Sequence, residues 1–268
     1  MKRLFLAAAA SLVALVLPGC IQSETTIHLN KDGSGTLVEQ TLLGMQMIDM
    51  LDSMAAGFGG DAKKDPVAEM FSTEKAKAKA ASLGAGVTFE KSEPLSYKTG
   101  KGARVTYRFA DINSLKISPN ENMKNLSPMA GQAPPTAKQN PVVFVYSGGT
   151  LVMTLPEPKK ADDDTPKPSD APDGGPEAEA MMKQMLGDMK ISLQLIVKSG
   201  IAETDATYRD GNTITLMQMD MGKLLEKPET LKKLQSAPKG DPTAALEMFK
   251  GIEGMKMETK KSVTVKLN

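Results

Sequence analysis

Methionine provides the most regular pattern of potential metal ligands in the chain. Three Met-x-Met runs occur: Met45-x-Met47, Met217-x-Met219-x-Met221 and Met255-x-Met257. Thioether sulfur is a soft ligand that selects Cu(I), so Met217, Met219 and Met221 are the first candidates for a copper site. The alternative is core packing, because a chain with 19 Met, no Trp, 7 Phe and 4 Tyr needs another large side chain to fill its interior.

The segment around Asp32 has part of the ligand spacing of an EF-hand calcium loop. Asn30, Asp32, Gly33 and Glu39 fall at its positions 3, 5, 6 and 12, where oxygen ligands and the glycine of the tight turn belong. Position 1 holds His28, a poor calcium ligand, and the flanking residues alternate between apolar and polar. We therefore expect an Asp-Gly β-hairpin with a type I′ turn here instead.

Residues that could form a catalytic group are sparse. The chain has one His and one Cys, so it cannot build a zinc site of clustered His and Cys by itself. His28 would need a nucleophile and an orienting carboxylate from elsewhere in the fold. Lys260 or Lys261 together with Ser262 could form a Ser–Lys pair, but a charged run near the C-terminus is more typical of a solvated face. We expect no enzyme activity and no cofactor.

The charge balance excludes one large class of partners. The chain has 33 Lys and Arg against 32 Asp and Glu, which gives a net charge of +1. Proteins that bind nucleic acid depend on clustered positive charge to neutralise phosphates. We therefore expect no nucleic-acid partner.

The N-terminus carries the pattern of an export signal. Lys2 and Arg3 precede an apolar run, Leu4–Val16, which is shorter than the roughly 20 residues of a membrane-spanning helix. The run ends in Leu17-Pro18-Gly19-Cys20. This sequence resembles the lipobox of bacterial lipoproteins, with an aliphatic residue three before the Cys and a small residue directly before it.

The lipobox resemblance implies that Cys20 becomes the acylated first residue of the mature chain. Two or more acyl chains hold a protein stably in a bilayer, so the expected location is the cell envelope, membrane-anchored through Cys20. In bacteria with two membranes, an Asp after the Cys retains such proteins in the inner membrane. Ile21 at this position therefore implies the periplasmic face of the outer membrane. The expected partners are the membrane itself and an envelope protein or lipid.

Composition divides the chain into four parts. Residues 1–19 are the signal peptide, and residues 20–155 and 177–268 are expected to form the two parts of one domain. Between them, residues 156–176 are rich in Pro, Asp and Lys and carry no large apolar side chain. Such a segment cannot bury enough apolar surface to offset its conformational entropy, which predicts a disordered insert.

Alternating apolar residues and turn residues predict three hairpins. These centre on Asp32-Gly33, Ser147-Gly148-Gly149 and Asp210-Gly211. Further strands are expected at Val87–Phe89, Arg104–Ala110, Ile191–Lys198 and Ser262–Leu267. Helices are expected at Met45–Leu51, from Ser72 to Leu83, over Glu177–Met189 and from Asp241 to Phe249.

These elements predict an α+β protein, built on a mostly antiparallel β-sheet of hairpins with several short helices packed on it. If the third hairpin continues as one regular strand, Met217, Met219 and Met221 share a face with Thr213 and Thr215.

Several turns of the mature chain carry a family resemblance. The segments are Asn30–Thr36, Leu83–Val87, Ile191–Gly200 and Asp205–Ile214. They resemble the LppM-like envelope lipoproteins, which implies an envelope-anchored α+β module without an assigned enzymatic activity. We therefore expect a lipid-anchored, non-enzymatic binding or interaction module. Two alternatives remain: an envelope protein that binds Cu(I) through its Met-rich runs, and a lipid-handling lipoprotein with an apolar cavity of several hundred Å³.

Overall fold

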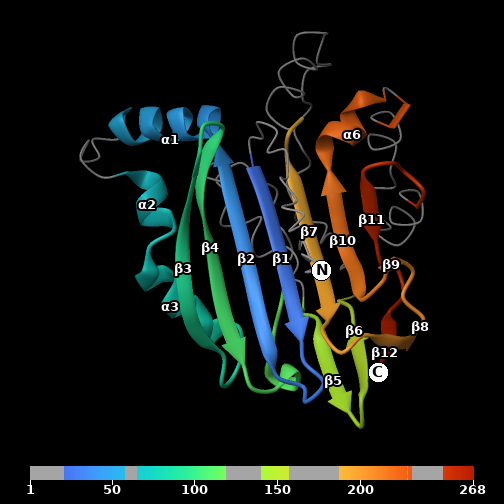
Figure 1. Cartoon of the computed structure of the whole chain (residues 1–268). Coiled ribbons are helices and arrows are strands. Elements are labelled where there is room, and N and C mark those ends of the chain that lie inside the picture. Colours follow the sequence, from blue (N-terminus) through green and yellow to red (C-terminus); the bar gives the residue numbers. More distant parts are fainter. Residues whose placement is uncertain (1–20, 58–64, 119–139, 157–186, 228, 231–249) are drawn as a thin grey trace, which may run out of the picture.

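The computed structural model describes residues 21–57, 65–118, 140–156, 187–227, 229–230 and 250–268, which form two β-sheets and a few short helices (Figure 1). The expected α+β class, with mostly antiparallel strands, is confirmed. In the described part of the chain, no helix is long and apolar enough to cross a membrane.

The large sheet has eight strands in the order β11-β10-β7-β1-β2-β4-β3, with the short β9 paired to β10. Its strands are β1 (Ile21–Leu29), β2 (Gly35–Gly44), β3 (Thr88–Tyr97), β4 (Gly100–Phe109), β7 (Lys190–Val197), β9 (Arg209–Asp210), β10 (Thr213–Asp220) and β11 (Met255–Met257). β1 and β7 are parallel, whereas the other pairs are antiparallel. The β1–β7 pair therefore joins the early and late parts of the chain at the centre of the sheet.

The small sheet has four strands in the order β5-β6-β12-β8. They are β5 (Val143–Ser147), β6 (Thr150–Thr154), β8 (Ile201–Thr204) and β12 (Ser262–Leu267). This sheet packs near the end of the large sheet where the β1–β2 turn lies (Figure 1). The side chain of Asn113 bonds the N–H and the carbonyl of Tyr146 on β5, at 2.5 and 3.3 Å. This contact occupies backbone groups of an edge strand that could otherwise pair with another chain.

The helices lie beside the large sheet, in the chain segments that follow its strands β2, β4 and β10. They are α1 (Met45–Gly57), α2 (Pro66–Met70), α3 (Thr73–Ser82), the 3-10 turn η1 (Ile112–Ser114) and α6 (Met221–Glu226). Helix α3 forms where it was predicted, and its cap is Ser72, whose hydroxyl accepts a hydrogen bond from the Lys75 N–H at 3.4 Å. The helices expected from Glu177 and from Asp241 fall outside the described residues, apart from the turn before β7.

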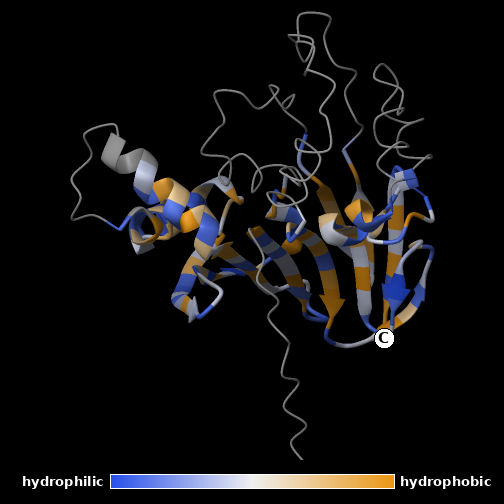
Figure 2. Ribbon diagram, turned by 90° about the horizontal axis from the view of Figure 1, so that it is seen from above, coloured by the Kyte–Doolittle hydropathy of each residue, from blue (hydrophilic) through white to orange (hydrophobic). Residues whose placement is uncertain are grey.

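One face of the large sheet, which we call the inner face, forms the main core. Ile27, Leu37 and Tyr107 lie in one row across β1, β2 and β4, and each is at most 1% exposed. The small sheet and α3 cover them with Leu151, Val263 and other apolar side chains. Figure 2 shows the resulting alternation of hydrophobic and hydrophilic residues along the strands. The opposite, outer face carries polar residues such as His28 and Arg108.

A second, smaller core lies at the other end of the sheet. Leu43 from the end of β2 packs with Ile48 and Leu51 of α1 and Val67 of α2. Ile21, the first residue of β1, packs against this cluster. The start of β1 is therefore held by side-chain packing as well as by its strand partner.

The hairpins form where they were predicted, but the turn at Asp32-Gly33 differs from expectation. At Gly148 and Gly149 both φ angles are positive, +55° and +78°, as a type I′ turn requires. At Asp32-Gly33 only Gly33 has positive φ, and its N–H donates to the Asn30 carbonyl at 3.2 Å. The predicted type I′ turn is wrong there. The Asp32 carboxylate accepts hydrogen bonds from the N–H and hydroxyl of Ser34, which stabilise Asp32 outside the left-handed region.

Strand β3 is much longer than the predicted Val87–Phe89. Its additional residues are mostly polar, since β3 forms an edge of the large sheet and faces solvent. The edge position also tolerates Pro94, which cannot donate a hydrogen bond to a neighbouring strand. The short strands β8 and β11 were not predicted.

Candidate functional site

An ion pair lies on the inner face, beside the apolar rows of the main core. Thr25 on β1 is directly opposite Glu39 on β2. Lys79, from the helix α3 that packs over the sheet, has its Nζ 2.7 Å from Glu39 Oε2 and 2.8 Å from Oε1. Both side chains are largely buried. The carboxylate of Glu39 is thus neutralised by a cation that the neighbouring helix supplies.

The ion pair borders a cavity between the sheet, α3 and the segment after η1. The other lining residues are Ser23, Thr25, Leu83, Ile117, Ser118, Ile191, Ser192, Leu193 and Met217. The cavity has about 20 Å³ of free space, which is room for about one water molecule. A lipid-handling protein needs an apolar cavity of several hundred Å³, so this space does not serve that function.

Tyr107 lies beside this region in the main core. Burial raises the pKa of its phenol, and the negative charge of Glu39 raises that pKa further. The phenol therefore stays protonated at neutral pH, and with its ring 6.5 Å from that of Phe89 it acts as a packing residue.

His28 lies on the outer face of β1, directly opposite Thr36 on β2 and Ile196 on β7. Burial lowers the pKa of its imidazole, and the positive charge of Lys198 lowers that pKa further. The ring is thus neutral at pH 7. Neither cross-strand neighbour supplies the orienting carboxylate that a catalytic triad needs.

The fold separates the residues of the EF-hand pattern. Asp32 lies in the β1–β2 turn and accepts two hydrogen bonds from Ser34. Glu39 lies on the inner face and is paired with Lys79. This segment folds as two antiparallel strands joined by a turn and not as a loop between two helices, so these side chains cannot enclose one ion. The β-hairpin is the correct interpretation.

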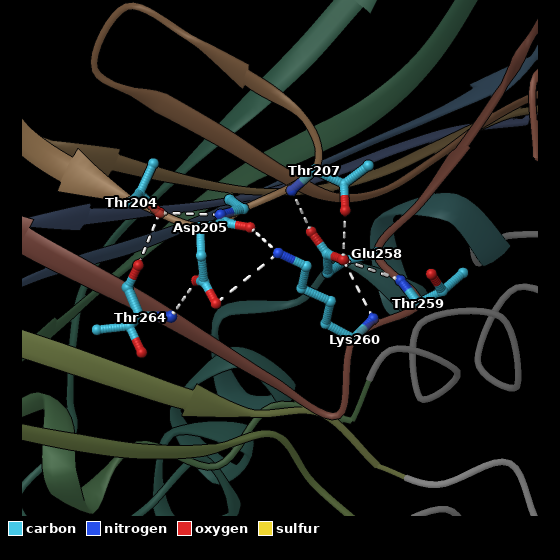
Figure 3. A network of polar contacts seen from close by, with 8 residues as sticks. Thr204, Asp205, Thr207, Glu258, Thr259, Lys260 and Thr264 are labelled. Atoms are coloured by element: carbon cyan, nitrogen blue, oxygen red, sulfur yellow. Dashed lines mark hydrogen bonds and ion pairs between the residues drawn. The ribbon is translucent and has the colours of Figure 1, made fainter.

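Lys260 belongs to a polar network that joins the loop after β8 to the loop before β12 (Figure 3). Its centre is Glu258, which is 5% exposed. Glu258 Oε2 accepts from the Thr207 N–H at 2.6 Å, and Oε1 accepts from the Thr207 hydroxyl at 2.7 Å. Oε1 also accepts from the N–H groups of Thr259 and Lys260, both at 3.1 Å. One carboxylate thus holds both loops.

Asp205 forms the second half of the same network. Its Oδ1 accepts from the Thr264 N–H at 2.7 Å, and the Lys260 ammonium donates to the Asp205 carbonyl. Lys260 Nζ also lies 3.8 Å from Asp205 Oδ2. Ser262 is a strand residue opposite Thr154 on β6. The arrangement around Lys260 is therefore that of a structural connection between loops.

The methionine runs occupy different positions from those expected. A register shift on β10 between Thr215 and Met217 places Met217 opposite Leu193 on β7, on the inner face. Met217 therefore does not share a face with Thr215, as a regular strand would require, and the predicted face is wrong. Met221 is not on the strand either, because it begins α6.

Two of the three runs nonetheless meet across strands. Met217 is directly opposite Met257, and Met219 is directly opposite Met255. Residues directly opposite in an antiparallel pair have Cβ atoms about 5 Å apart and point to the same side of the sheet. Met255 is buried and the other three are half-buried. We call these residues the four-methionine cluster. The third run, in Met45-x-Met47, lies on α1.

Cys20 lies outside the described residues, and β1 begins at the next residue, Ile21. Sequence reasoning missed the network around Glu258, because the Thr207 and Glu258 side chains meet only through tertiary folding. It missed the Glu39–Lys79 pair for the same reason. The only local signal for the Glu39–Lys79 pair is that a Glu stands at a core-facing position of a strand in which apolar and polar residues alternate.

No family model and no curated protein matches the chain. Among solved structures, it is similar to the NMR structure of the folded domain of LppM from Mycobacterium tuberculosis. The identity is 9%, the match covers 78% of this chain and 88% of that chain, and the TM-score is 0.33. This distant match to a lipoprotein domain is a loose similarity of arrangement.

Proposed function

We propose that this protein is a lipoprotein of the cell envelope, anchored in the membrane through acylated Cys20, whose folded domain is a non-enzymatic binding module. The observation that carries the proposal is the position of the first strand. β1 begins at Ile21, the residue directly after the lipobox Cys, where Ile21 pairs with Leu43 and packs against the second core, so the chain after Cys20 enters the fold at its first residue. Cleavage before Cys20 would leave this fold intact.

The anchor is tested by substituting Cys20. The wild-type chain is expected to incorporate a labelled fatty acid and to fractionate with membranes, and the Cys20→Ala chain to do neither. Ile21→Asp is a matched variant that keeps the acylated thiol, and in a bacterium with two membranes it should shift the protein to the inner membrane. Acylation of the Cys20→Ala chain would refute the anchor.

The non-enzymatic role is supported by the state of the polar groups that could do chemistry. Glu39 is paired with Lys79, and Glu258 accepts four hydrogen bonds from its neighbours. His28 is neutral and has no carboxylate directly opposite it. Groups that are already bound to one another in this way serve to hold elements together.

A binding module should retain its partner when these groups are changed conservatively. Cross-linking in intact envelopes followed by purification identifies the partner of the wild-type protein. The His28→Gln and Lys260→Met variants are expected to recover the same partner in similar amounts. If the partner were a substrate, it would accumulate on these variants relative to wild type, and that result would contradict the proposal.

The four-methionine cluster favours a second candidate function, binding of Cu(I). Four thioethers on one side of two adjacent strands match the soft ligands that this ion prefers. Half-buried side chains at the sheet edge leave an approach for the ion. No other Met-x-Met run is brought opposite a second run in the described part of the chain.

The copper candidate is tested by competition of the Cys20→Ala chain with a Cu(I) chelator. One Cu(I) per chain is expected, and the double variant Met217→Leu and Met257→Leu should lose it. The double variant Met45→Leu and Met47→Leu is the matched control and should bind as before. Equal binding by both double variants would exclude the four-methionine cluster as the site.

A further inference from the structure

We infer that the end of the domain at Met45, Tyr97 and Lys98 lies directly against the bilayer that holds the lipid anchor. We call these three residues the anchor-end surface. The inference rests on the proposed acylation of Cys20 and adds to it an orientation and a lipid-contacting surface.

The strand register places this surface beside the start of β1. Ile21 is opposite Leu43 on β2, and in the next row Gly44 is opposite Gly100 on β4, which in turn is opposite Tyr97 on β3. Neighbouring strands are about 4.8 Å apart, so β3 is only about 14 Å from β1 across the sheet. Tyr97 therefore ends its strand at the level along the sheet at which β1 begins.

No flexible linker separates the lipid anchor at Cys20 from the folded domain. Consecutive Cα atoms are about 3.8 Å apart, and no residue separates Cys20 from the first residue of β1. Ile21 is itself held by its packing against the second core of Leu43, Ile48 and Leu51. Figure 1 shows β2 leading into α1 at this end of the large sheet, beside the start of β1. Lipid attached to Cys20 must then keep this end of the domain at the membrane surface.

The chemistry of the surface suits this position. Tyr97 is 43% exposed and Met45 is 38% exposed, and they are two of the four large apolar side chains that are exposed among the described residues. The other two, Val143 and Val145, lie on β5 at the opposite end. Tyrosine places its ring at the level of lipid headgroups with its hydroxyl in water. The neighbouring Lys98 is exposed and can extend its ammonium to the phosphates. α1 also exposes Asp49 and Asp52, so the hairpin turn and Met45 make the contact rather than the length of the helix.

The opposite end of the molecule provides a matched reference position. Val145 is 55% exposed on β5. The next residue, Tyr146, donates a hydrogen bond from its hydroxyl to the Lys31 carbonyl in the β1–β2 turn. This turn is separated from the start of β1 by a strand of nine residues, a distance of about 27 Å at roughly 3.4 Å per residue.

Fluorescence quenching by lipid tests the inference, because the chain has no Trp of its own. The acylated mature chain is reconstituted into phosphatidylethanolamine and phosphatidylglycerol vesicles with brominated acyl chains. Tyr97→Trp and, separately, Met45→Trp should lose emission relative to unbrominated vesicles, with a shift to shorter wavelength. Val145→Trp should show neither change. Mass spectrometry of the same samples reports acylation.

Insertion of a flexible linker tests whether the direct connection between Cys20 and β1 is what holds this end of the domain at the membrane. About 15 Gly and Ser residues inserted between Cys20 and Ile21 span about 20 Å on average, which frees the domain from the surface. The quenching of Tyr97→Trp should then fall towards the level of Val145→Trp while acylation is unchanged.

The outcomes separate the inference from the function on which it rests. An acylated chain in which Tyr97→Trp is quenched no more than Val145→Trp refutes the orientation and leaves the lipoprotein proposal standing. Quenching that survives the insertion also overturns the inference, since the contact would not depend on the anchor. A chain without acyl groups refutes both.

Discussion

Glu258→Gln tests whether one buried carboxylate holds the two loops around Lys260 together. The substitution changes the size of the side chain little and replaces one of the two oxygens by an amide nitrogen. In wild type, Oε1 accepts three hydrogen bonds and Oε2 accepts one, from the Thr207 N–H at 2.6 Å. The amide keeps the most bonds when its oxygen takes the Oε1 position, which leaves its NH₂ facing the Thr207 N–H.

The expected loss of stability follows from the number of hydrogen bonds that the amide cannot make. One hydrogen bond to a charged acceptor is lost, worth about 1.5–3 kcal/mol, and two donors are left facing each other. We expect the free energy of unfolding to fall by about 2–3 kcal/mol. For a protein of this size, about 2–4 °C per kcal/mol converts this loss to a decrease in Tm of about 4–12 °C.

Thermal unfolding followed by circular dichroism measures the effect. Glu253→Gln is the control for an exposed carboxylate, because Glu253 accepts a hydrogen bond from the Lys227 ammonium at 2.8 Å but both side chains are 61% exposed. Its Tm should stay close to that of wild type. Equal Tm values for Glu258→Gln and Glu253→Gln would refute the view that the Glu258 carboxylate stabilises the fold.

Three further predictions concern single sites. His28 is the one His of the chain, so its imidazole NMR signal should titrate alone, with a pKa below the ordinary 6.5. Because the unfolded chain then binds the proton more readily, the contribution of His28 to stability is full above pH 6.5 and falls as the pH drops through the native pKa. Lys198→Gln should raise the pKa of His28 part of the way towards 6.5. An unchanged titration in this variant would contradict the effect assigned to the charge of Lys198. Leu37→Ala should lower the free energy of unfolding in urea by about 2–5 kcal/mol, because the Leu37 side chain is fully buried. Val145→Ala, at an exposed position, should change it by no more than about 0.5 kcal/mol. Similar losses in the two variants would refute the assigned core. Gly149→Ala should cost about 1–2 kcal/mol through its backbone alone, since φ is +78° and nothing lies within 4 Å of the added Cβ, and an unchanged midpoint would argue against this turn.

Local patterns predicted the elements whose conformation depends on their own residues. A strand was expected at Arg104–Ala110, and there Val105, Tyr107 and Phe109 alternate with other residues and are all buried on β4. Ser72 indicated the start of α3, and the consecutive glycines at Gly148 and Gly149 indicated a tight hairpin. In each case the backbone geometry is decided within a few residues, so the pattern is sufficient.

The pairing of distant segments could not be predicted in this way. Alternation records which residues are buried but does not identify the strand that lies alongside, so the parallel pairing of β1 with β7 had no local signal. The register shift after Thr215 moved Met217 to the inner face, and the unpredicted strand β11 brought Met257 opposite Met217. A single-residue change of register reverses every side chain that follows it.

The sequence by itself determined the hairpins, the helix cap of α3 and the expectation of a lipid anchor at Cys20, because each depends on neighbouring residues. Only the tertiary structure decided that Glu39 meets Lys79, that Glu258 joins two loops and that Tyr97 lies at the same end as Ile21. These contacts join segments far apart in the chain. They exist because burial and strand pairing act on the folded chain as a whole, and no short stretch of sequence contains that information.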